Sequence, residues 1–278
     1  MTTRYGADRP MRVALAGFGN VGRELAQRLC GGALPEAQLT AISAHDLDGA
    51  RAASADLDPR PVVVPVAGLP THADVIVECA TAAALPEIAR VVLGAGKVLV
   101  PVSVGGLAAH PEILDLAAQR RGRIRIATGA LPGLDAIRTA AEDAIRSVRL
   151  TSRIRPESLA HEDYVRERGF DFATPPAAAV EVFDGTARAA ALAFPRHFNV
   201  AVTISLAGIG LDHTRVTMFA DPEIAGTVHL VEVDGDNLQL RLESRNRPSP
   251  ANPRTSRAVA PSIIAALRAM VAPVQIGS

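Results

Sequence analysis

Six consecutive residues near the start of the chain have the spacing of a phosphate-binding turn. They form the motif Gly17, Phe18, Gly19, Asn20, Val21 and Gly22. The first glycine permits a tight turn, the second leaves room for a pyrophosphate, and the third lets the next helix pack closely. The free N–H groups and partial positive charge at that helix start attract phosphates. We therefore predict a dinucleotide site that the first five residues of the motif contact. A glycine turn without a ligand is the alternative.

The choice between NAD and NADP depends on the end of the second expected strand. In NAD sites an acidic residue about 20 positions after the motif binds the ribose 2′-OH. No acid stands at the strand end here, and Ser43, His45 or Arg51 could accept a 2′-phosphate. Asp46 and Asp48 lie further into the loop, where either could instead cap the next helix. The sequence is compatible with both cofactors.

Residues 1–128 alternate between expected strands and expected helices. Apolar runs predict strands at Met11–Ala16, Gln38–Ser43, Val62–Val66, Asp74–Cys79, Lys97–Val102 and Arg123–Ala127. Helical spacing of apolar residues predicts helices at Asn20–Cys30, Pro86–Leu93 and Pro111–Arg120. Near-continuous apolar strands separated by helices imply a parallel sheet covered on both faces. We predict an α/β domain with a doubly wound parallel sheet of the Rossmann type.

Residues 129–256 show longer expected strands and predict a second domain of the α+β class. The strands are expected at Val148–Arg153, Asn199–Ala207, Thr214–Ala220, Thr227–Val233 and Leu238–Ser244. The Asp234–Gly235 turn signal indicates a hairpin, so the sheet should be mixed or antiparallel. The other expected elements are a helix at Gly133–Arg146, a long loop at Glu157–Pro176 and a helix at Ala258–Val271. We expect the C-terminal segment 257–278 to pack back on the first domain.

The composition excludes several classes of protein. Lys and Arg together number 29, as do Asp and Glu, so no net charge attracts nucleic acid or anionic membranes. No apolar run reaches the roughly 20 residues of a membrane span, and residues 1–10 lack the apolar core of a signal peptide. Cys30 and Cys79 form no CxxC pair, and no cluster has metal-ligand spacing. We expect a cytoplasmic protein with reduced thiols and no metal.

Segments along nearly the whole chain resemble the L-aspartate dehydrogenases of de novo NAD biosynthesis. Besides the glycine motif, they are VIVECA at 75–80, VPVSVGGLA at 100–108, ATGALPGLDAI at 127–137, EVFDGTARAAALAFPRHFNVAVTISLAGIGLDHTRV at 181–216, ADPEIAGTVHLVEVDG at 220–235 and NRPSPANPRTS at 246–256. The last four are more specific than the glycine motif. The resemblance implies a homodimer that oxidatively deaminates L-aspartate with NAD or NADP, or runs the reverse reaction.

The resemblance also implies roles for three residues. Ala130 and Asn199 would contact the cofactor, and His229 would be the catalytic histidine. The chain departs from the family at Leu131-Pro132, where Ile-Gly is usual, and at residues 152–156, Ser-Arg-Ile-Arg-Pro, where Thr-Arg-Lys-Pro is usual. The missing lysine lies on the expected substrate side. These departures therefore bear on the exact substrate more than on the reaction type.

The implied reaction moves a hydride from an amino-acid Cα to nicotinamide and leaves an imine, which water hydrolyses to a ketone and ammonia. It needs a group that exchanges protons near neutral pH, and the ordinary pKa of histidine, about 6.5, suits this role. Among seven histidines, His229 alternates with Val231 and Val233 in an expected strand. That position is more typical of a packed core residue, but the resemblance favours catalysis. His197 and His213 are the alternatives.

A small dicarboxylic amino acid also needs cations, and arginine suits carboxylates. The candidates are Arg153, Arg155, Arg196 and Arg254, each of which is more typical of a solvated surface charge than of a ligand. Cys79 and Ala80 end the fourth expected strand, where a dinucleotide crosses the carboxyl edge of such a sheet. Hydride transfer requires no thiol nucleophile. Asn199 could bind the nicotinamide amide or its ribose, or simply initiate a strand.

Two other functions fit the same architecture. One is a catalytically silent dinucleotide-binding sensor or regulatory protein, in which His229 is a packing residue. The other is a related reductase or dehydrogenase that acts on another small amino acid. The joint presence of Ala130, Asn199 and His229 in their motifs argues against the silent protein.

Overall fold

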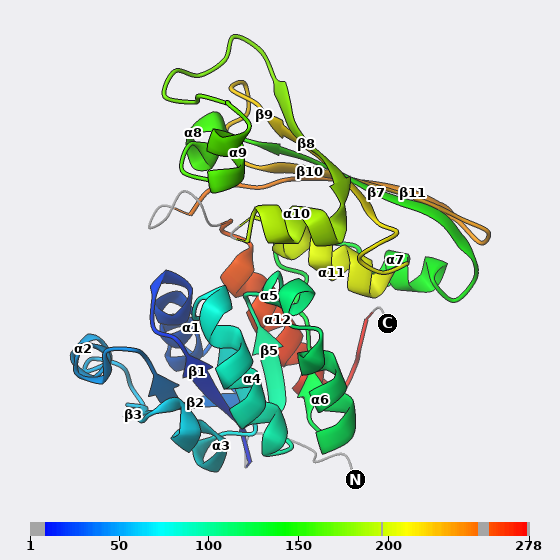
Figure 1. The fold of residues 1–278 in the computed structure, drawn as a ribbon. Coiled ribbons are helices and arrows are strands. Elements are labelled where there is room, and N and C mark those ends of the chain that lie inside the picture. Colours follow the sequence, from blue (N-terminus) through cyan, green and yellow to red (C-terminus); the bar gives the residue numbers. More distant parts are fainter. Residues whose placement is uncertain (1–8, 196, 250–255, 277–278) are drawn as a thin grey trace. The chain divides into compact units, whose positions relative to one another are not determined.

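The computed structural model describes residues 9–195, 197–249 and 256–276. The chain divides into two compact units (Figure 1). The first unit comprises Met1–Ala127 and Val259–Ile276, and the second comprises mainly Thr128–Ala258.

The first unit holds a six-stranded sheet in the order β3-β2-β1-β4-β5-β6, with every pair parallel. The strands are β1 Met11–Ala16, β2 Ala37–Ser43, β3 Val62–Val63, β4 Val75–Glu78, β5 Val98–Pro101 and β6 Arg123–Ile124. The helices are α1 Asn20–Cys30, α2 Leu47–Ala53, α3 Leu69–His72, α4 Leu85–Gly94, α5 Gly106–Ala109, α6 Glu112–Arg120 and α12 Val259–Val271. The predicted doubly wound parallel sheet is confirmed. The chain adds strands outward from β1 in one direction and from β4 in the other, and dinucleotides bind such sheets at the carboxyl ends of the two strands where the order switches.

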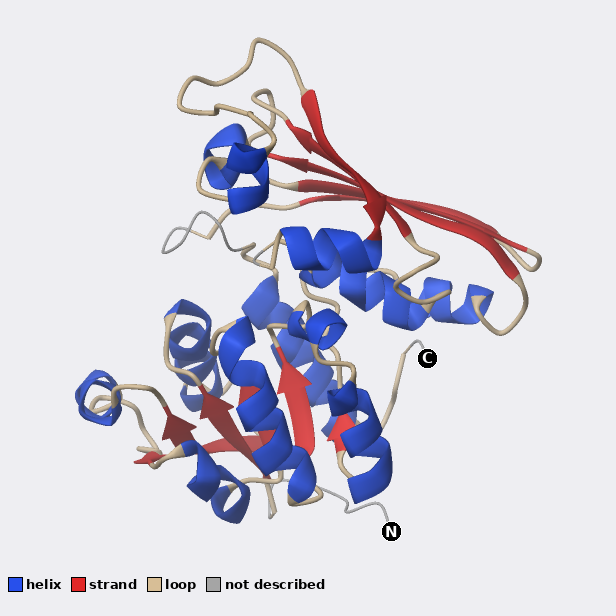
Figure 2. Ribbon diagram, viewed as in Figure 1, coloured by secondary structure: helices blue, strands red, loops and turns tan. Residues whose placement is uncertain are grey.

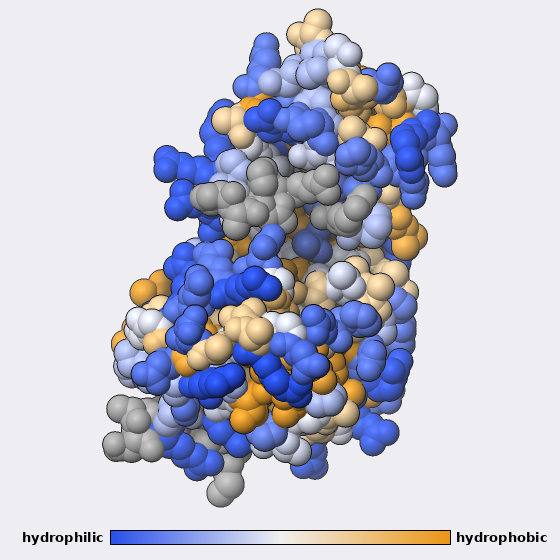
Figure 3. All heavy atoms as spheres, turned by 90° about the vertical axis from the view of Figure 1, so that its left-hand side faces the viewer, coloured by the Kyte–Doolittle hydropathy of each residue, from blue (hydrophilic) through white to orange (hydrophobic). Residues whose placement is uncertain are grey.

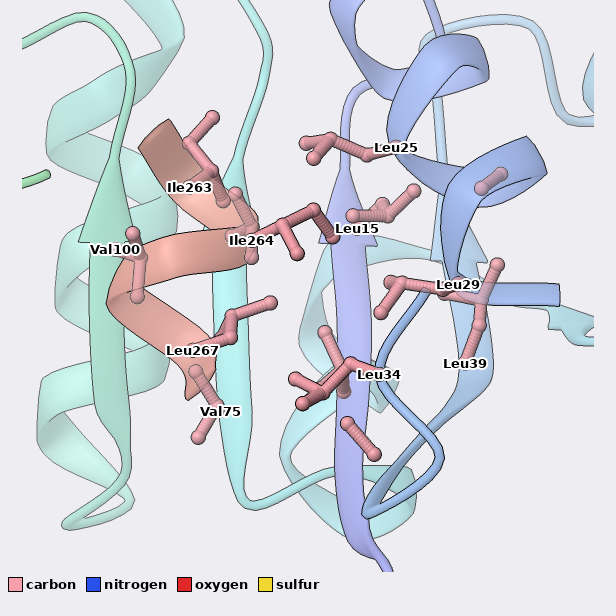
Figure 4. Packing of buried hydrophobic residues seen from close by; sticks show 14 of the residues in the cluster. Leu15, Leu25, Leu29, Leu34, Leu39, Val75, Val100, Ile263, Ile264 and Leu267 are labelled. Atoms are coloured by element: carbon pink, nitrogen blue, oxygen red, sulfur yellow. The ribbon is translucent and has the colours of Figure 1, made fainter. Parts of the chain in front are cut away.

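The core of the first unit explains why its strands are apolar without alternation. Helices cover both faces of the sheet (Figure 2), so side chains on either face of β1 and β4 are buried. Figure 4 shows Ile264 and Leu267 of α12 pointing across one face toward Leu15 and Leu34, and all four are buried. Each such side chain contributes about 1.5–3 kcal/mol by leaving water. The C-terminal helix is thus an integral part of this core.

The second unit holds a five-stranded mixed sheet in the order β11-β10-β7-β9-β8. Its strands are β7 Ile145–Ile154, β8 Val180–Thr186, β9 Arg215–Ala220, β10 Val228–Gly235 and β11 Gln239–Arg245. Its helices are α7 Leu134–Ala140, α8 Pro156–Leu159, α9 Asp163–Glu167, α10 Ala187–Ala193 and α11 Asn199–Ala207. The expected hairpin joins β10 to β11, while β7 and β9 run parallel. Helices α7, α10 and α11 lie along one face of the sheet (Figure 2).

The strand predicted at Asn199–Ala207 is wrong, because this segment is helix α11. Its sequence, NVAVTISLA, is rich in β-branched residues and has no polar stripe, which favours a strand when read alone. In the structure the helix is buried over Val200–Ser205, since it packs between α7 and α10. A helix buried on all sides shows no amphipathic period, so its sequence could not identify it.

Two further predictions for the second unit are also corrected. A helix was predicted at Gly133–Arg146, but the observed helix α7 ends at Ala140. The last two residues of the predicted range, Ile145 and Arg146, are the first two of β7. The long loop predicted at Glu157–Pro176 contains α9 and most of α8. Strand β8 and helix α10 were not predicted. The start of α10 nevertheless has a local signal, because Thr186 caps it through the N–H of Ala189 at 3.2 Å.

The surface is mostly hydrophilic on the side that Figure 3 draws. Hydrophobic side chains form smaller patches there. Over the described residues, no helix is both long and apolar enough to cross a membrane.

Candidate functional site

The glycine turn of the first unit lies directly between β1 and α1. Gly17 has φ +111°, a conformation that other residues rarely adopt. A Cβ at Gly17 would lie 2.5 Å from the carbonyl carbon of Cys79 and 2.6 Å from the nitrogen of Ala80. Only glycine therefore lets the turn pass against the end of β4. The structure thus brings together the turn and the two residues after β4, Cys79 and Ala80, that were expected to bind the cofactor.

The other two glycines of the motif have different surroundings. A Cβ at Gly22 would lie 2.4 Å from the carbonyl oxygen of Gly17, so this glycine lets α1 begin close against the turn. A Cβ at Gly19 would meet no atom within 4 Å. Gly19 therefore faces open space, and α1 has no side-chain cap on its first N–H groups. An open cradle next to free helix N–H groups fits a pyrophosphate.

Cys79 follows β4 directly and is a poor candidate nucleophile. Burial, and secondly the charge of Glu78, raise the pKa of its thiol well above 9.0. The thiol is therefore protonated at neutral pH and acts as a packing group. This fits a reaction that needs no thiolate.

Glu78 is the residue of this edge that sequence reasoning missed. It is fully buried, and its carboxylate accepts four hydrogen bonds from two loops. The donors are the N–H of Ala80 at 2.8 Å, the N–H of Ser103 at 2.9 Å, the N–H of Val102 at 3.1 Å and the hydroxyl of Ser103 at 3.1 Å. Burial raises its pKa, and these hydrogen bonds oppose the rise. A carboxylate at the end of an otherwise apolar strand was the available signal.

These four hydrogen bonds to Glu78 have a structural consequence. The carboxylate ties the segment after β4 to the segment after β5, at the carboxyl edge where dinucleotides bind in such sheets. Ala80 is thereby held in place by a buried charge rather than by packing alone.

The loop after β2 holds the residues expected to choose between NAD and NADP. The carbonyl of Ser43 accepts a hydrogen bond from the N–H of Gly17 at 2.7 Å, so the strand end adjoins the glycine turn. The hydroxyl of Ser43 is buried and has no partner among the described residues. Asp46 caps α2, which confirms the capping interpretation, and Asp48 pairs with Arg51. Neither carboxylate stands at the strand end.

His229 lies in β10 of the second unit, as predicted, on the same buried face as Val231 and Val233. Its side chain is 4% exposed, and its Nδ1 lies 2.9 Å from the hydroxyl of Ser152 on β7. Burial lowers the pKa of His229 to about 4. The imidazole is therefore neutral at neutral pH.

Ala130 is hydrogen-bonded to Ser244, the residue of β11 that is paired with His229. Its carbonyl accepts this hydrogen bond from the Ser244 hydroxyl at 2.8 Å. Asn199 is the first residue of α11, and its carbonyl accepts a hydrogen bond from Thr203 at 2.8 Å. Asn199 therefore begins a helix rather than a strand.

Two of the cationic candidates, Arg153 and Arg155, are engaged in ion pairs. Arg153 donates to the buried Asp221 at 2.8 Å and lies over the ring of Phe219, and Arg155 pairs with Glu157. Arg196 and Arg254 lie outside the described residues.

The two alternative histidines have different surroundings. His197 lies 3.1 Å from the buried carboxylate of Glu162 through its Nε2. Its ring is therefore committed to a partner within the second unit. His213 stands between α11 and β9, next to Asp212.

A doubly wound sheet with an open glycine turn, joined to a mixed sheet with a buried histidine, defines a dehydrogenase that uses a nicotinamide dinucleotide. Residues 17–127 match the model of the homoserine dehydrogenase NAD-binding domain, and residues 135–270 match that of the aspartate dehydrogenase C-terminal domain. The chain belongs to the L-aspartate dehydrogenase family. It is an oxidoreductase with an NAD or NADP cofactor.

Individual relatives support this assignment. L-aspartate dehydrogenase 3 of Bordetella bronchiseptica is 44% identical over 96% of this chain and 97% of its own length. The L-aspartate dehydrogenase of Bradyrhizobium diazoefficiens is 38% identical over 98% of this chain and 96% of its own length. The crystal structure of aspartate dehydrogenase from Thermotoga maritima has the same fold, with a TM-score of 0.70, 22% identity and coverage of 96% and 99%.

Proposed function

We propose that this protein oxidises L-aspartate to iminoaspartate, which water converts to oxaloacetate and ammonia, or that it runs the reverse reductive amination. The observation that carries the proposal is the 44% identity to an L-aspartate dehydrogenase over nearly the whole of both chains. The open cradle at Gly19 and the buried, neutral His229 supply groups that this reaction requires.

The first unit supplies the dinucleotide contacts in this proposal. Residues 17–21 receive the pyrophosphate, and Cys79 and Ala80 lie along the carboxyl edge beside it. From the second unit, Ala130 and Asn199 contact the cofactor, as the family resemblance implies. When bound, the nicotinamide accepts the hydride that leaves the substrate Cα.

His229 exchanges the proton in this proposal. Oxidation of the amine releases a proton as the carbon–nitrogen double bond forms, and a neutral imidazole accepts it. The pKa of about 4 is that of the buried residue in the protein alone. The two carboxylates of a bound substrate add negative charge, which raises the pKa of a neighbouring histidine toward neutrality.

We also propose that the protein is a cytoplasmic homodimer. The residues of β7, β10 and β11 that alternate with the buried face carry charges of both signs, including Arg149, Glu232 and Arg241 in neighbouring strands. A two-fold interface can set such charges opposite their counterparts in a second copy. Sedimentation equilibrium would give twice the chain mass, and a monomer at assay concentration would contradict the proposal.

The deciding experiment is a substrate screen on the purified protein. NAD and NADP reduction would be followed with L- and D-aspartate, L-glutamate, L-alanine and L-homoserine, and the reverse reaction with oxaloacetate and ammonia. We expect turnover with L-aspartate well above the others. Tight dinucleotide binding without turnover would favour the silent sensor, and preference for another amino acid would favour the related dehydrogenase.

A further inference from the structure

We propose that Ser152 is a positioning residue that commits Nδ1 of His229 to the protein, so that Nε2 alone exchanges protons with the substrate. This inference rests on the proposed function for its kinetic part. It does not need that function for its structural part, because the ring can be observed in the protein without substrate.

The sheet register places the two side chains together. Strands β7 and β10 are antiparallel, and Ser152 and His229 stand directly opposite each other. Side chains at opposed positions lie on the same face about 4.5–5.5 Å apart at Cβ. Ser152 is fully buried, and its hydroxyl oxygen is 2.9 Å from Nδ1. In the part of the chain that the structure describes, this is the one hydrogen bond of the His229 ring.

The chemistry of a hydroxyl suits this task better than that of a carboxylate. The Ser152 oxygen can accept a hydrogen bond from Nδ1–H, which leaves the lone pair of neutral His229 on Nε2. When Nε2 takes a proton, the Nδ1–H bond to Ser152 persists, so the ring need not reorient. A carboxylate would favour the charged imidazolium before the reaction began.

The other flank of His229 provides a matched comparison. Ser244 stands opposite His229 on β11, but its hydroxyl donates to the carbonyl of Ala130 at 2.8 Å. Two serines therefore border the ring in neighbouring strands, and only Ser152 bonds to it. Loss of the Ser244 hydroxyl should leave the His229 tautomer unchanged.

The test combines nitrogen NMR of the ring with kinetics. In protein labelled with ¹⁵N-histidine, with His229 assigned from the His229→Asn variant, we expect Nδ1 at a protonated shift and Nε2 at an unprotonated shift. Ser152→Val should lose this pattern. Ser152→Thr should retain it, because threonine has nearly the shape of valine but keeps a hydroxyl. Ser244→Ala should retain it as well. For L-aspartate, Ser152→Val should lower kcat about 10- to 100-fold with KM within about 2-fold, and Ser152→Thr should recover most of the loss.

Each outcome decides the proposal. The same nitrogen shifts in wild type and in Ser152→Val, or equal kcat for the Val and Thr variants, would overturn it. If Ser152→Val does not fold, Ser152→Ala gives the same comparison without added bulk. If the wild-type protein does not oxidise L-aspartate, the proposed function fails, and the nitrogen shifts still test the assignment of Ser152.

Discussion

The two candidate sites, one in each unit, are built in opposite ways. The proposed phosphate turn of the first unit is made of consecutive backbone groups, which Gly17 and Gly22 allow to pack closely and Gly19 leaves open. The proposed proton-transfer site of the second unit is a side-chain pair, Ser152 and His229, whose members are 77 residues apart and meet through strand register. The first kind of site depends on the absence of side chains, and the second depends on two side chains at one sheet position. Substitutions should therefore affect binding in one unit and turnover in the other.

The largest expected effect is in the backbone half of the comparison. Gly19→Val should abolish measurable NAD(P) binding in a calorimetric titration without lowering the melting temperature, because its side chain would enter the open space that the pyrophosphate needs. Gly94→Val is the control. A Cβ at Gly94 also meets nothing within 4 Å, but Gly94 is the last residue of α4 and not part of the glycine turn. Unchanged affinity in Gly19→Val would show that the cradle is elsewhere.

The second effect concerns the pH dependence of stability of the side-chain half. The pKa of His229 is about 4 in the folded protein and about 6.5 when unfolded, so the unfolded chain binds more protons between these values. Stability is therefore lost as the pH falls from about 6.5 to about 4, by about 3 kcal/mol for a pKa difference of about 2.5. Denaturant unfolding gives the free energy of unfolding at pH 7 and at pH 4. Between these pH values, wild type should lose about 3 kcal/mol more than His229→Asn loses. Equal losses in both proteins would contradict a buried neutral ring.

A third, smaller effect separates loop positioning from phosphate binding within the first unit. Glu78→Gln replaces one acceptor oxygen by an NH2 group, so a partly buried N–H of this edge loses its partner, which costs about 1–3 kcal/mol of stability. We expect a lower melting temperature and about 10-fold weaker NAD(P) binding. The exposed Glu87→Gln should change neither. If the destabilised Glu78→Gln variant kept wild-type affinity for NAD(P), the hydrogen bonds of Glu78 would not shape the cofactor site.

The smallest effect is expected in the loop after β2. Arg51 is half exposed and forms an ion pair with Asp48. We therefore expect its contact with a 2′-phosphate to contribute only about 1 kcal/mol of binding free energy. Arg51→Ala should raise the KM for NADP about 5-fold and leave the KM for NAD within about 2-fold. Steady-state kinetics with each cofactor measures both values. An equal rise for both cofactors would show that this loop does not distinguish them.

The same contrast explains what the sequence could reveal. Helix α1 was predicted with its observed bounds, Asn20–Cys30, because a glycine turn and an apolar stripe are local features. The partnership of Ser152 with His229 was not predictable, since one residue of register slip would turn either side chain to the other face. Glu78 was missed for a related reason, because its four donors come from two loops that only the fold brings together.

The most direct test of the account is the kinetics of His229→Asn. The account predicts that kcat for L-aspartate falls about 10²- to 10⁴-fold, the usual cost of losing a proton-transfer group, while the melting temperature at pH 7 and the NAD(P) affinity are kept. A packing histidine would behave differently, with stability lowered by about 1–3 kcal/mol and turnover largely retained. Near wild-type turnover in a folded His229→Asn protein would contradict the central claim, and His197 and His213 would then be the histidines to test.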